Sequence, residues 1–339
     1  MNFIEPPIKC FLHHAFPLGV FWDENNPEIM KWFCVNYNYM FGSQKLDDCC
    51  YSYLVSYKNI PFLQKREIFG DELQKYLTKD TIAHMVKLFI DNGNFVEVIS
   101  DLFYLPVSEA YQLEHYMHEI LIVGYDDEKE TYIIRDYVNH SFMEIEIEQS
   151  KIVPFENGSY YGDDVVIKLY RKREGIFNLS IKAFMLQIRD FYESINPYYR
   201  IGNIYGNYFN TWDKAFGFEA YKTMLAYLQS EESIDYRIVR LIQEHFNGMK
   251  IKFSFLQKEE YQEIKYLDEM VQFYTRSAIN AEEIVLLGVK QTLIQDEDKM
   301  RDVKEKVLDE LKELIIQEKK VIEKFLEINK MLKIPNDFV

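Results

Sequence analysis

Residues 118–137, HEILIVGYDDEKETYIIRDY, constrain the fold more than any other part of the sequence. Two apolar runs flank a charged turn, which is the pattern of an antiparallel β-hairpin. With the turn near residue 128, the numbers of facing residues sum to about 256, so that Ile120 faces Asp136. Side chains alternate along a strand, and this register therefore puts His118 and Asp136 on one face as diagonal neighbours. An odd sum would put them on opposite faces, and the turn alone does not fix the register.

The pair of His118 and Asp136 is a candidate for acid–base chemistry. A carboxylate beside an imidazole fixes its tautomer and stabilises the imidazolium. A thiol or hydroxyl nucleophile needs such a pair as its base. The alternative is an unrelated histidine and aspartate at exposed strand ends.

Cys10 is the candidate nucleophile. It follows EPPIK and opens CFLHHAF, a stretch that can begin a helix, and both the helix N-terminus and Lys9 favour a thiolate there. Cys49 and Cys50 compete for the role, but they follow two aspartates, which disfavour a thiolate. Cys34 lies in an apolar stretch and is expected to be a small core residue.

The other histidines give weaker signals. His115 and His118 form an H-x-x-H pattern that suggests a metal, but no third ligand stands at a recognisable spacing, and we expect no metal site. His14 lies four residues after Cys10 and could contact it on a helix, but it lacks an orienting acid. No glycine-rich phosphate loop or dinucleotide fingerprint is present, and we expect no cofactor.

The sequence predicts an α+β fold with an antiparallel sheet in the first half. Residues 95–106 predict a strand that enters a loop at Pro106, and residues 142–148 and 163–171 predict two further strands. Helical spacing predicts a helix over 71–93. Composition shifts at RKREG, residues 171–175. We therefore expect an N-terminal domain over 1–172 and a mainly helical C-terminal domain over 173–339.

The second half carries amphipathic helical patterns at 216–229, 234–249 and 297–332. In the last of these, apolar residues recur at helical intervals: Val303, Val307, Leu311, Leu314, Ile322 and Phe325. This stripe predicts a packing helix or, alternatively, a coiled coil that makes a homodimer.

Composition excludes some classes of function. The 339 residues carry 39 Lys+Arg and 55 Asp+Glu, a net charge of −16. Such a chain repels nucleic acid and anionic membranes, so we expect neither as a partner, whereas a cationic amine is tolerated. There is no secretory signal and no apolar stretch near 18 residues, and the four cysteines are too few and oddly spaced for a disulfide framework. A reduced, cytoplasmic protein is the expectation.

Taken together, these motifs resemble the butirosin biosynthesis protein H family, a papain-like group of acyltransferases in natural-product clusters. The likeness is carried by an early Cys, the DLFYLP segment, the HEILIVGYDD strand and the YIIRDY strand, in that order. FGFEAYKTMLAYL and RIVRLIQEHFNGMK in the second half also look like that family.

The resemblance implies a papain-like fold with Cys10 as nucleophile, His118 as base and Asp136 as orienting acid. The implied reaction transfers an acyl group from a carrier-protein thioester to a small-molecule amine. Carrier proteins are generally acidic, so a basic patch is expected, and KLYRKR supplies four residues for it: Lys168, Arg171, Lys172 and Arg173. A cysteine peptidase or amidase, and a binding or scaffold protein with a decayed site, are the alternatives.

Overall fold

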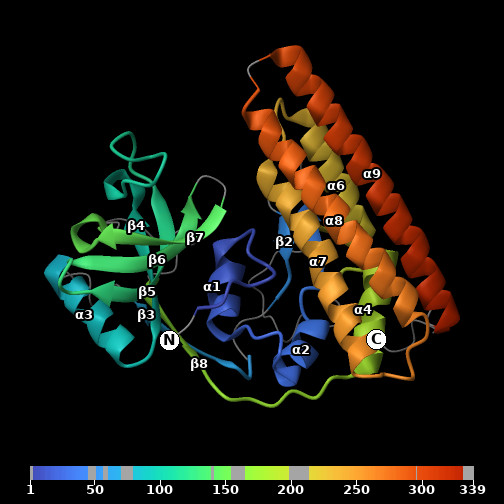
Figure 1. The fold of residues 1–339 in the computed structure, drawn as a ribbon, viewed down its shortest axis with the longest axis horizontal. Coiled ribbons are helices and arrows are strands. Elements are labelled where there is room, and N and C mark those ends of the chain that lie inside the picture. Colours follow the sequence, from blue (N-terminus) through green and yellow to red (C-terminus); the bar gives the residue numbers. More distant parts are fainter. Residues whose placement is uncertain are drawn as a thin grey trace. The chain divides into compact units, whose positions relative to one another are not determined.

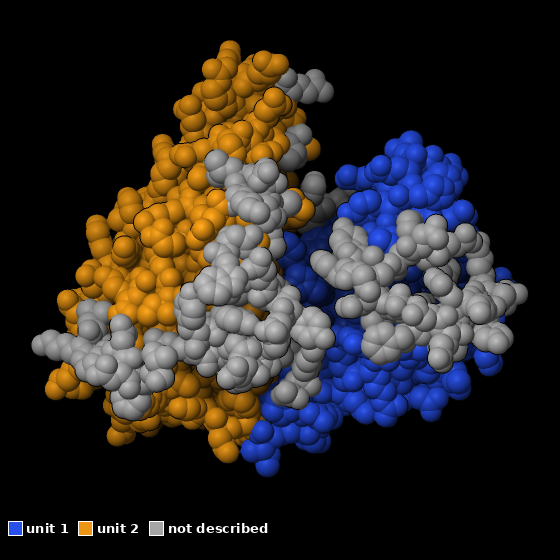
Figure 2. All heavy atoms as spheres, turned by 180° about the vertical axis from the view of Figure 1, so that it is seen from behind, with its two compact units in different colours: residues 1–23, 57–176 blue, residues 24–56, 177–339 orange. Residues whose placement is uncertain are grey.

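The computed structural model describes residues 3–44, 51–55, 60–69, 79–138, 141–153, 165–197, 214–294 and 296–330. The chain forms two compact units, coloured separately in Figure 2. Unit 1 comprises residues 1–23 and 57–176, and unit 2 comprises residues 24–56 and 177–339. The structure is mixed helix and sheet, with antiparallel sheets and a helical C-terminal region, as the sequence predicts.

Unit 1 is built around a six-stranded antiparallel sheet in the order β3-β8-β4-β5-β6-β7 (Figure 1). Its elements are α1 (Leu12–Phe21), β3 (Leu63–Phe69), α3 (Lys79–Asp91), β4 (Phe95–Asp101), β5 (Met117–Asp126), β6 (Thr131–Val138), β7 (Ser141–Glu148) and β8 (Val165–Lys172), with single 3₁₀ turns at Leu102–Tyr104 and Gln149–Lys151.

Side chains alternate between the two faces of this sheet, and a helix packs on each face. Ile120, Ile122 and Ile134 point to one face, where they form a buried cluster with Ile82 and Val86 of α3. Complete burial of such a side chain stabilises the fold by roughly 1.5–3 kcal/mol. The central strands are therefore held by an apolar core on the α3 face.

The other face is covered by α1. Tyr137 and Phe142 are paired on neighbouring strands, and their rings lie 5.5 Å apart. The ring of Phe142 also lies 6.4 Å from that of Phe16 in α1. Helices α1 and α3 therefore lie on opposite faces of one sheet (Figure 1).

Unit 2 contains a helical bundle and a small three-stranded antiparallel sheet in the order β2-β1-β9. Its elements are α2 (Pro27–Cys34), β1 (Met40–Ser43), β2 (Tyr51–Tyr53), α4 (Ile181–Glu193), β9 (Lys214–Phe216), α6 (Gly217–Ser230), α7 (Tyr236–Lys258), α8 (Leu267–Thr292) and α9 (Glu297–Ile328). Of the apolar stripe predicted on the last helix, Val307, Leu311, Leu314, Ile322 and Phe325 are buried inside this unit. The prediction that α9 is a packing helix is confirmed. The homodimer stays a hypothesis, and the buried stripe of α9 does not support it.

The division between the units differs from the predicted one in residues 24–56. This segment belongs to the helical unit, although it precedes most of the sheet in sequence. Asn38 shows why: its Oδ1 accepts a hydrogen bond from Nζ of Lys252 at 2.5 Å, and its Nδ2 donates to Gln187 at 2.6 Å. Lys252 is buried, and burial lowers its pKa to about 7. Buried polar groups of this kind hold a segment firmly because leaving them unpaired is costly.

Four helices of unit 2 meet at one buried carboxylate, Glu318 of α9. Tyr221 of α6 donates to its Oε2 at 2.9 Å, and Tyr274 of α8 donates to its Oε1 at 2.9 Å. Nε2 of His245 in α7 lies 2.8 Å from the same Oε1. The exposed fraction of Glu318 is 0%. The carboxylate is therefore stabilised entirely by protein donors.

This arrangement predicts that Glu318→Ala destabilises unit 2 strongly. The change leaves two hydroxyls and an imidazole buried without their acceptor, and removing one partner from a buried ionic network costs about 3–5 kcal/mol. Urea unfolding followed by far-ultraviolet circular dichroism measures it. Glu318→Gln, which keeps the volume and one acceptor oxygen, should lose less. Equal stability of the Ala variant and the unmodified protein would contradict the role of Glu318.

Candidate active site

The register of the β5–β6 hairpin determines whether His118 and Asp136 can meet. At the turn the pairs are Asp126 with Thr131 and Tyr125 with Tyr132, whose numbers sum to 257. Continued to the open end, this register would put His118 and Asp136 on opposite faces.

A β-bulge corrects the register. Between the pairs Gly124–Ile133 and Ile122–Ile134 the ladder shifts by one residue, so that Val123 is the extra residue of β5. Beyond it the sum is 256, as in Leu121 with Arg135. The predicted register is thus present at the open end, and the bulge produces it.

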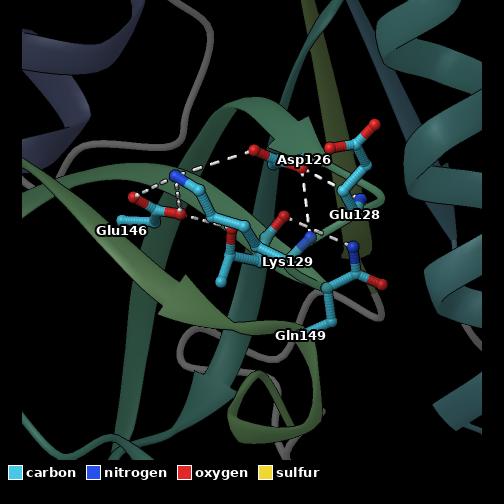
Figure 3. Close-up of polar contacts among 6 residues, drawn as sticks. Asp126, Glu128, Lys129, Glu146 and Gln149 are labelled. Carbon is cyan, nitrogen blue, oxygen red and sulfur yellow. Dashed lines mark hydrogen bonds and ion pairs between the residues drawn. The ribbon is translucent and has the colours of Figure 1, made fainter.

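Polar contacts close the turn of this hairpin (Figure 3). Oδ1 of Asp126 accepts hydrogen bonds from the backbone N–H groups of Glu128 and Lys129, at 2.9 and 3.1 Å. Nζ of Lys129 lies 3.1 Å from Oε1 of Glu146 on β7. The backbone N–H of Gln149 donates to the Glu130 carbonyl at 2.9 Å. These bonds fix the turn, and with it the start of the ladder, against β7.

His118 and Asp136 form the predicted pair. Nε2 of His118 lies 2.8 Å from Oδ1 of Asp136, so this nitrogen carries a proton and donates to the carboxylate. Asp136 is 2% exposed, and the backbone N–H of Tyr137 donates to the same oxygen at 2.7 Å. Burial lowers the pKa of His118, but the hydrogen bond and charge of Asp136, with the charge of Glu119, outweigh it and raise the pKa above 6.5. The imidazole is held ready to carry a proton near neutral pH.

Cys10 lies in a bend two residues before α1 and is 8% exposed. Its segment is anchored at both ends. The backbone N–H of Ile4 donates to the Gly19 carbonyl at 3.1 Å, and the hydroxyl of Tyr137 donates to the Lys9 carbonyl at 2.5 Å. A Cβ at Gly19 would lie 2.1 Å from the Phe3 ring, so glycine permits this close approach.

The Tyr137 contact brings the backbone at Cys10 to the open end of the hairpin. Tyr137 is next to Asp136 on β6, and alternation directs their side chains to opposite faces of the sheet. The Cys10 segment therefore meets the hairpin on the α1 face. The separation of about 4–5 Å expected between the Cys10 sulfur and the His118 ring stays a prediction.

The competing residues fall into three cases. Cys34 is fully buried, and burial raises the pKa of its thiol to about 12, which confirms it as a core residue. Cys49 and Cys50 lie outside the described residues. His14 is buried in α1, and burial with the neighbouring His13 lowers its pKa well below 6.5, so it stays neutral.

A second histidine–carboxylate pair, which we did not predict, lies at the same end of the sheet. Nδ1 of His115 is 2.7 Å from Oδ2 of Asp101, the last residue of β4. Oδ1 of Asp101 accepts a hydrogen bond from the backbone N–H of Phe103 at 3.0 Å. The rings of His115 and Phe103 are stacked, with centroids 4.4 Å apart. The sequence signal for this pair is Asp101, the aspartate that opens DLFYLP within the strand predicted before Pro106.

The two histidines of the H-x-x-H pattern thus have separate carboxylates. His115 contacts Asp101, and His118 contacts Asp136. Within the described part of the chain, no three His, Cys, Asp or Glu side chains are grouped closely enough to hold a metal ion.

The four residues of the expected basic patch differ in their contacts. Nζ of Lys168 lies 2.5 Å from Oε1 of the buried Glu97, whose Oε2 accepts from the Tyr170 hydroxyl at 2.7 Å. The side chain of Arg171 donates to the carbonyls of Asn92 and Gly93, and that of Arg173 to those of Ile60 and Pro61. Lys172 is exposed. The ion pair with Glu97 offsets the charge of Lys168, and the contact of these residues with a carrier protein stays a prediction.

No known protein-family model matches this chain, and a comparison with curated proteins finds no relative. Among the described helices, none combines the length and the apolar character that a membrane span requires.

The geometry predicts that the raised pKa of His118 depends on Asp136. The Asp136→Asn variant should titrate at a lower pH than the unmodified protein, because the carboxylate that favours the imidazolium is gone. Since the folded pKa is raised, the stabilisation from this pair is fully present below the unfolded value of about 6.5 and is lost as the pH rises through the folded pKa. NMR titration of the imidazole protons measures the shift. An unchanged pKa in Asp136→Asn would refute the assignment.

Proposed function

We propose that the protein is a papain-like, cysteine-dependent acyltransferase of the butirosin biosynthesis protein H type, which moves an acyl group from a carrier-protein thioester to an amine. The observation that supports it best is the 2.8 Å contact between Nε2 of His118 and Oδ1 of Asp136. A buried carboxylate that orients an imidazole with a raised pKa is the arrangement that a thiol nucleophile requires.

We assign roles to the atoms of the pair on the basis of its contacts. Asp136 occupies Nε2, which leaves Nδ1 as the nitrogen that exchanges protons with Cys10 and the substrate. Cys10 precedes the N-terminus of α1, where no side chain caps the backbone N–H groups. The helix dipole at this end favours a thiolate, and the Cys10 N–H supplies a donor for the oxyanion.

The reaction then has two halves. The Cys10 thiolate attacks the thioester carbonyl, and the C–S bond to the carrier breaks as His118 protonates the departing thiolate. An amine next attacks the acyl-Cys10 carbonyl, a C–N bond forms, and the C–S bond to Cys10 breaks. His118 accepts the proton that the amine nitrogen loses, which restores the starting state.

Intact mass spectrometry tests the nucleophile. Incubated with an acyl thioester and no amine, the unmodified protein should gain one acyl mass, and Cys10→Ala should gain none, because only Cys10 forms the acyl intermediate. Cys34→Ala is the matched control and should be acylated normally. Equal acylation of Cys10→Ala would overturn the assignment, and no acylation of the unmodified protein would favour a scaffold.

The basic residues that remain on β8 and after it predict a salt-dependent contact with an acidic carrier protein. Lys172→Glu should weaken carrier binding about two- to five-fold at low salt, the effect of an exposed charge pair, and the difference should vanish near 1 M salt, where the Debye length is about 3 Å. Calorimetry or surface plasmon resonance measures it. Lys320→Glu, the same charge change on α9, should bind normally. Equal affinities at every salt concentration would remove this surface from the proposal.

A further inference from the structure

The pair of His115 and Asp101 has the features of an acid–base group rather than a structural contact. Asp101 is 6% exposed and holds its carboxylate in place through the Phe103 backbone N–H. His115 is oriented by that carboxylate and by the ring of Phe103, yet its side chain is 59% exposed. With Nδ1 bound to Asp101, Nε2 is the nitrogen available for chemistry.

The loop between β4 and β5 closes through other bonds. The backbone N–H of Leu102 donates to the Tyr116 carbonyl at 2.9 Å, and that of Gln112 donates to the Phe103 carbonyl at 3.0 Å. The first bond continues the β4–β5 ladder by one residue, and the second joins two points within the loop. The His115 side chain is therefore not needed to close the loop, while the contact with Asp101 fixes its tautomer.

The position of Asp101 relates this pair to Cys10. Asp101 is paired with Met117, and the next pair along the ladder is Ser100 with His118. Asp101 and Phe95 are six residues apart on β4, so their side chains point to the same face of the sheet. The ring of Phe95 lies 6.1 Å from that of Phe3, which also contacts Phe142, so this face is the α1 face. This is the face on which the Cys10 segment contacts Tyr137. The two histidine–carboxylate pairs thus lie at one end of the sheet, on opposite faces, and Asp101 is on the face that the Cys10 segment contacts through Lys9.

The proposed reaction requires two proton acceptors. An alkylamine has a pKa of about 10, so at neutral pH it arrives as an ammonium ion and must lose one proton before its nitrogen can attack. The attacking nitrogen loses a second proton as the C–N bond forms. His118 can accept only one of these.

We propose that His115, oriented by Asp101, is the general base that deprotonates the incoming ammonium before it attacks acyl-Cys10. Nε2 of His115 takes the N–H proton, the nitrogen keeps the electron pair, and His115 later releases the proton to solvent. The inference rests on the proposed function and adds to it a substrate class, alkylamines that are protonated in solution. The exposed side chains of Tyr104, Leu113 and Tyr116 on the same loop give the acceptor apolar surface beside the charged nitrogen.

The test separates acylation from transfer. The protein is first acylated with an acyl thioester, and the acyl-protein is then mixed with a simple alkylamine or with hydroxylamine, which is largely uncharged at neutral pH. His115→Asn should be acylated at the unmodified rate, but its transfer to the alkylamine should fall about 10²-fold, a typical contribution of a general base. Transfer to hydroxylamine should be nearly unchanged, because that acceptor needs no prior deprotonation.

Two further variants make the result decisive. Asp101→Asn should show the same selective loss in a milder form, since it leaves the imidazole without its charged partner. His84→Asn, at an exposed histidine of α3, should behave as the unmodified protein in both assays. Thermal melting of each variant checks that the fold is intact.

Each outcome decides one claim. Equal losses with the alkylamine and hydroxylamine would show that His115 acts through structure and would overturn the inference. Loss of acylation in His115→Asn would make it the base for Cys10 itself, which also overturns the inference. If the unmodified protein is never acylated, the proposed function fails and the inference fails with it.

Discussion

The extra residue at Val123 is the constraint on which the candidate site depends. In a hairpin without a bulge, the residue numbers of every facing pair have the same sum from the turn to the open end. Here that sum is 257 at the turn and 256 at the open end. The two registers are not equivalent for core packing, because Ile120 and Ile122 must point to the α3 face to be buried. The same bulge that buries these isoleucines therefore also turns His118 toward Asp136, so that core packing and the polar pair are selected together.

The elements that the sequence predicts well are those whose pattern is local. The alternation in residues 142–148 and the two halves of the hairpin give strands at β5, β6 and β7 within two residues of the expected bounds. The helical spacing from residue 297 gives α9. In each case the spacing of apolar residues and the turn residues lie within one short stretch of sequence, and such local patterns predict secondary structure well.

What the sequence does not reveal depends on contacts between distant residues. Glu318 meets Tyr221 across 97 positions and His245 across 73, and nothing in the pattern of α9 distinguishes it from the exposed acids around it. Segment 24–56 joins unit 2 through Asn38 and Lys252, which are 214 positions apart. The pairing of His115 with Asp101 is not predicted for a related reason: the H-x-x-H spacing suggests one shared ligand, whereas each histidine contacts its own carboxylate.

The two pairs at the end of the sheet show how one residue type is given two roles by its surroundings. Both aspartates are almost fully buried, and each orients one imidazole. The ring of His118 is only 25% exposed, so it is partly desolvated and its proton is held by nearby carboxylates. The side chain of His115 is 59% exposed, so water can reach its ring. A group that must keep a proton for a leaving thiolate benefits from the first environment, whereas a group that must pass protons from substrate to solvent benefits from the second. In this interpretation the open end of β5 is a site with one sheltered and one exposed proton acceptor, on opposite faces of the sheet.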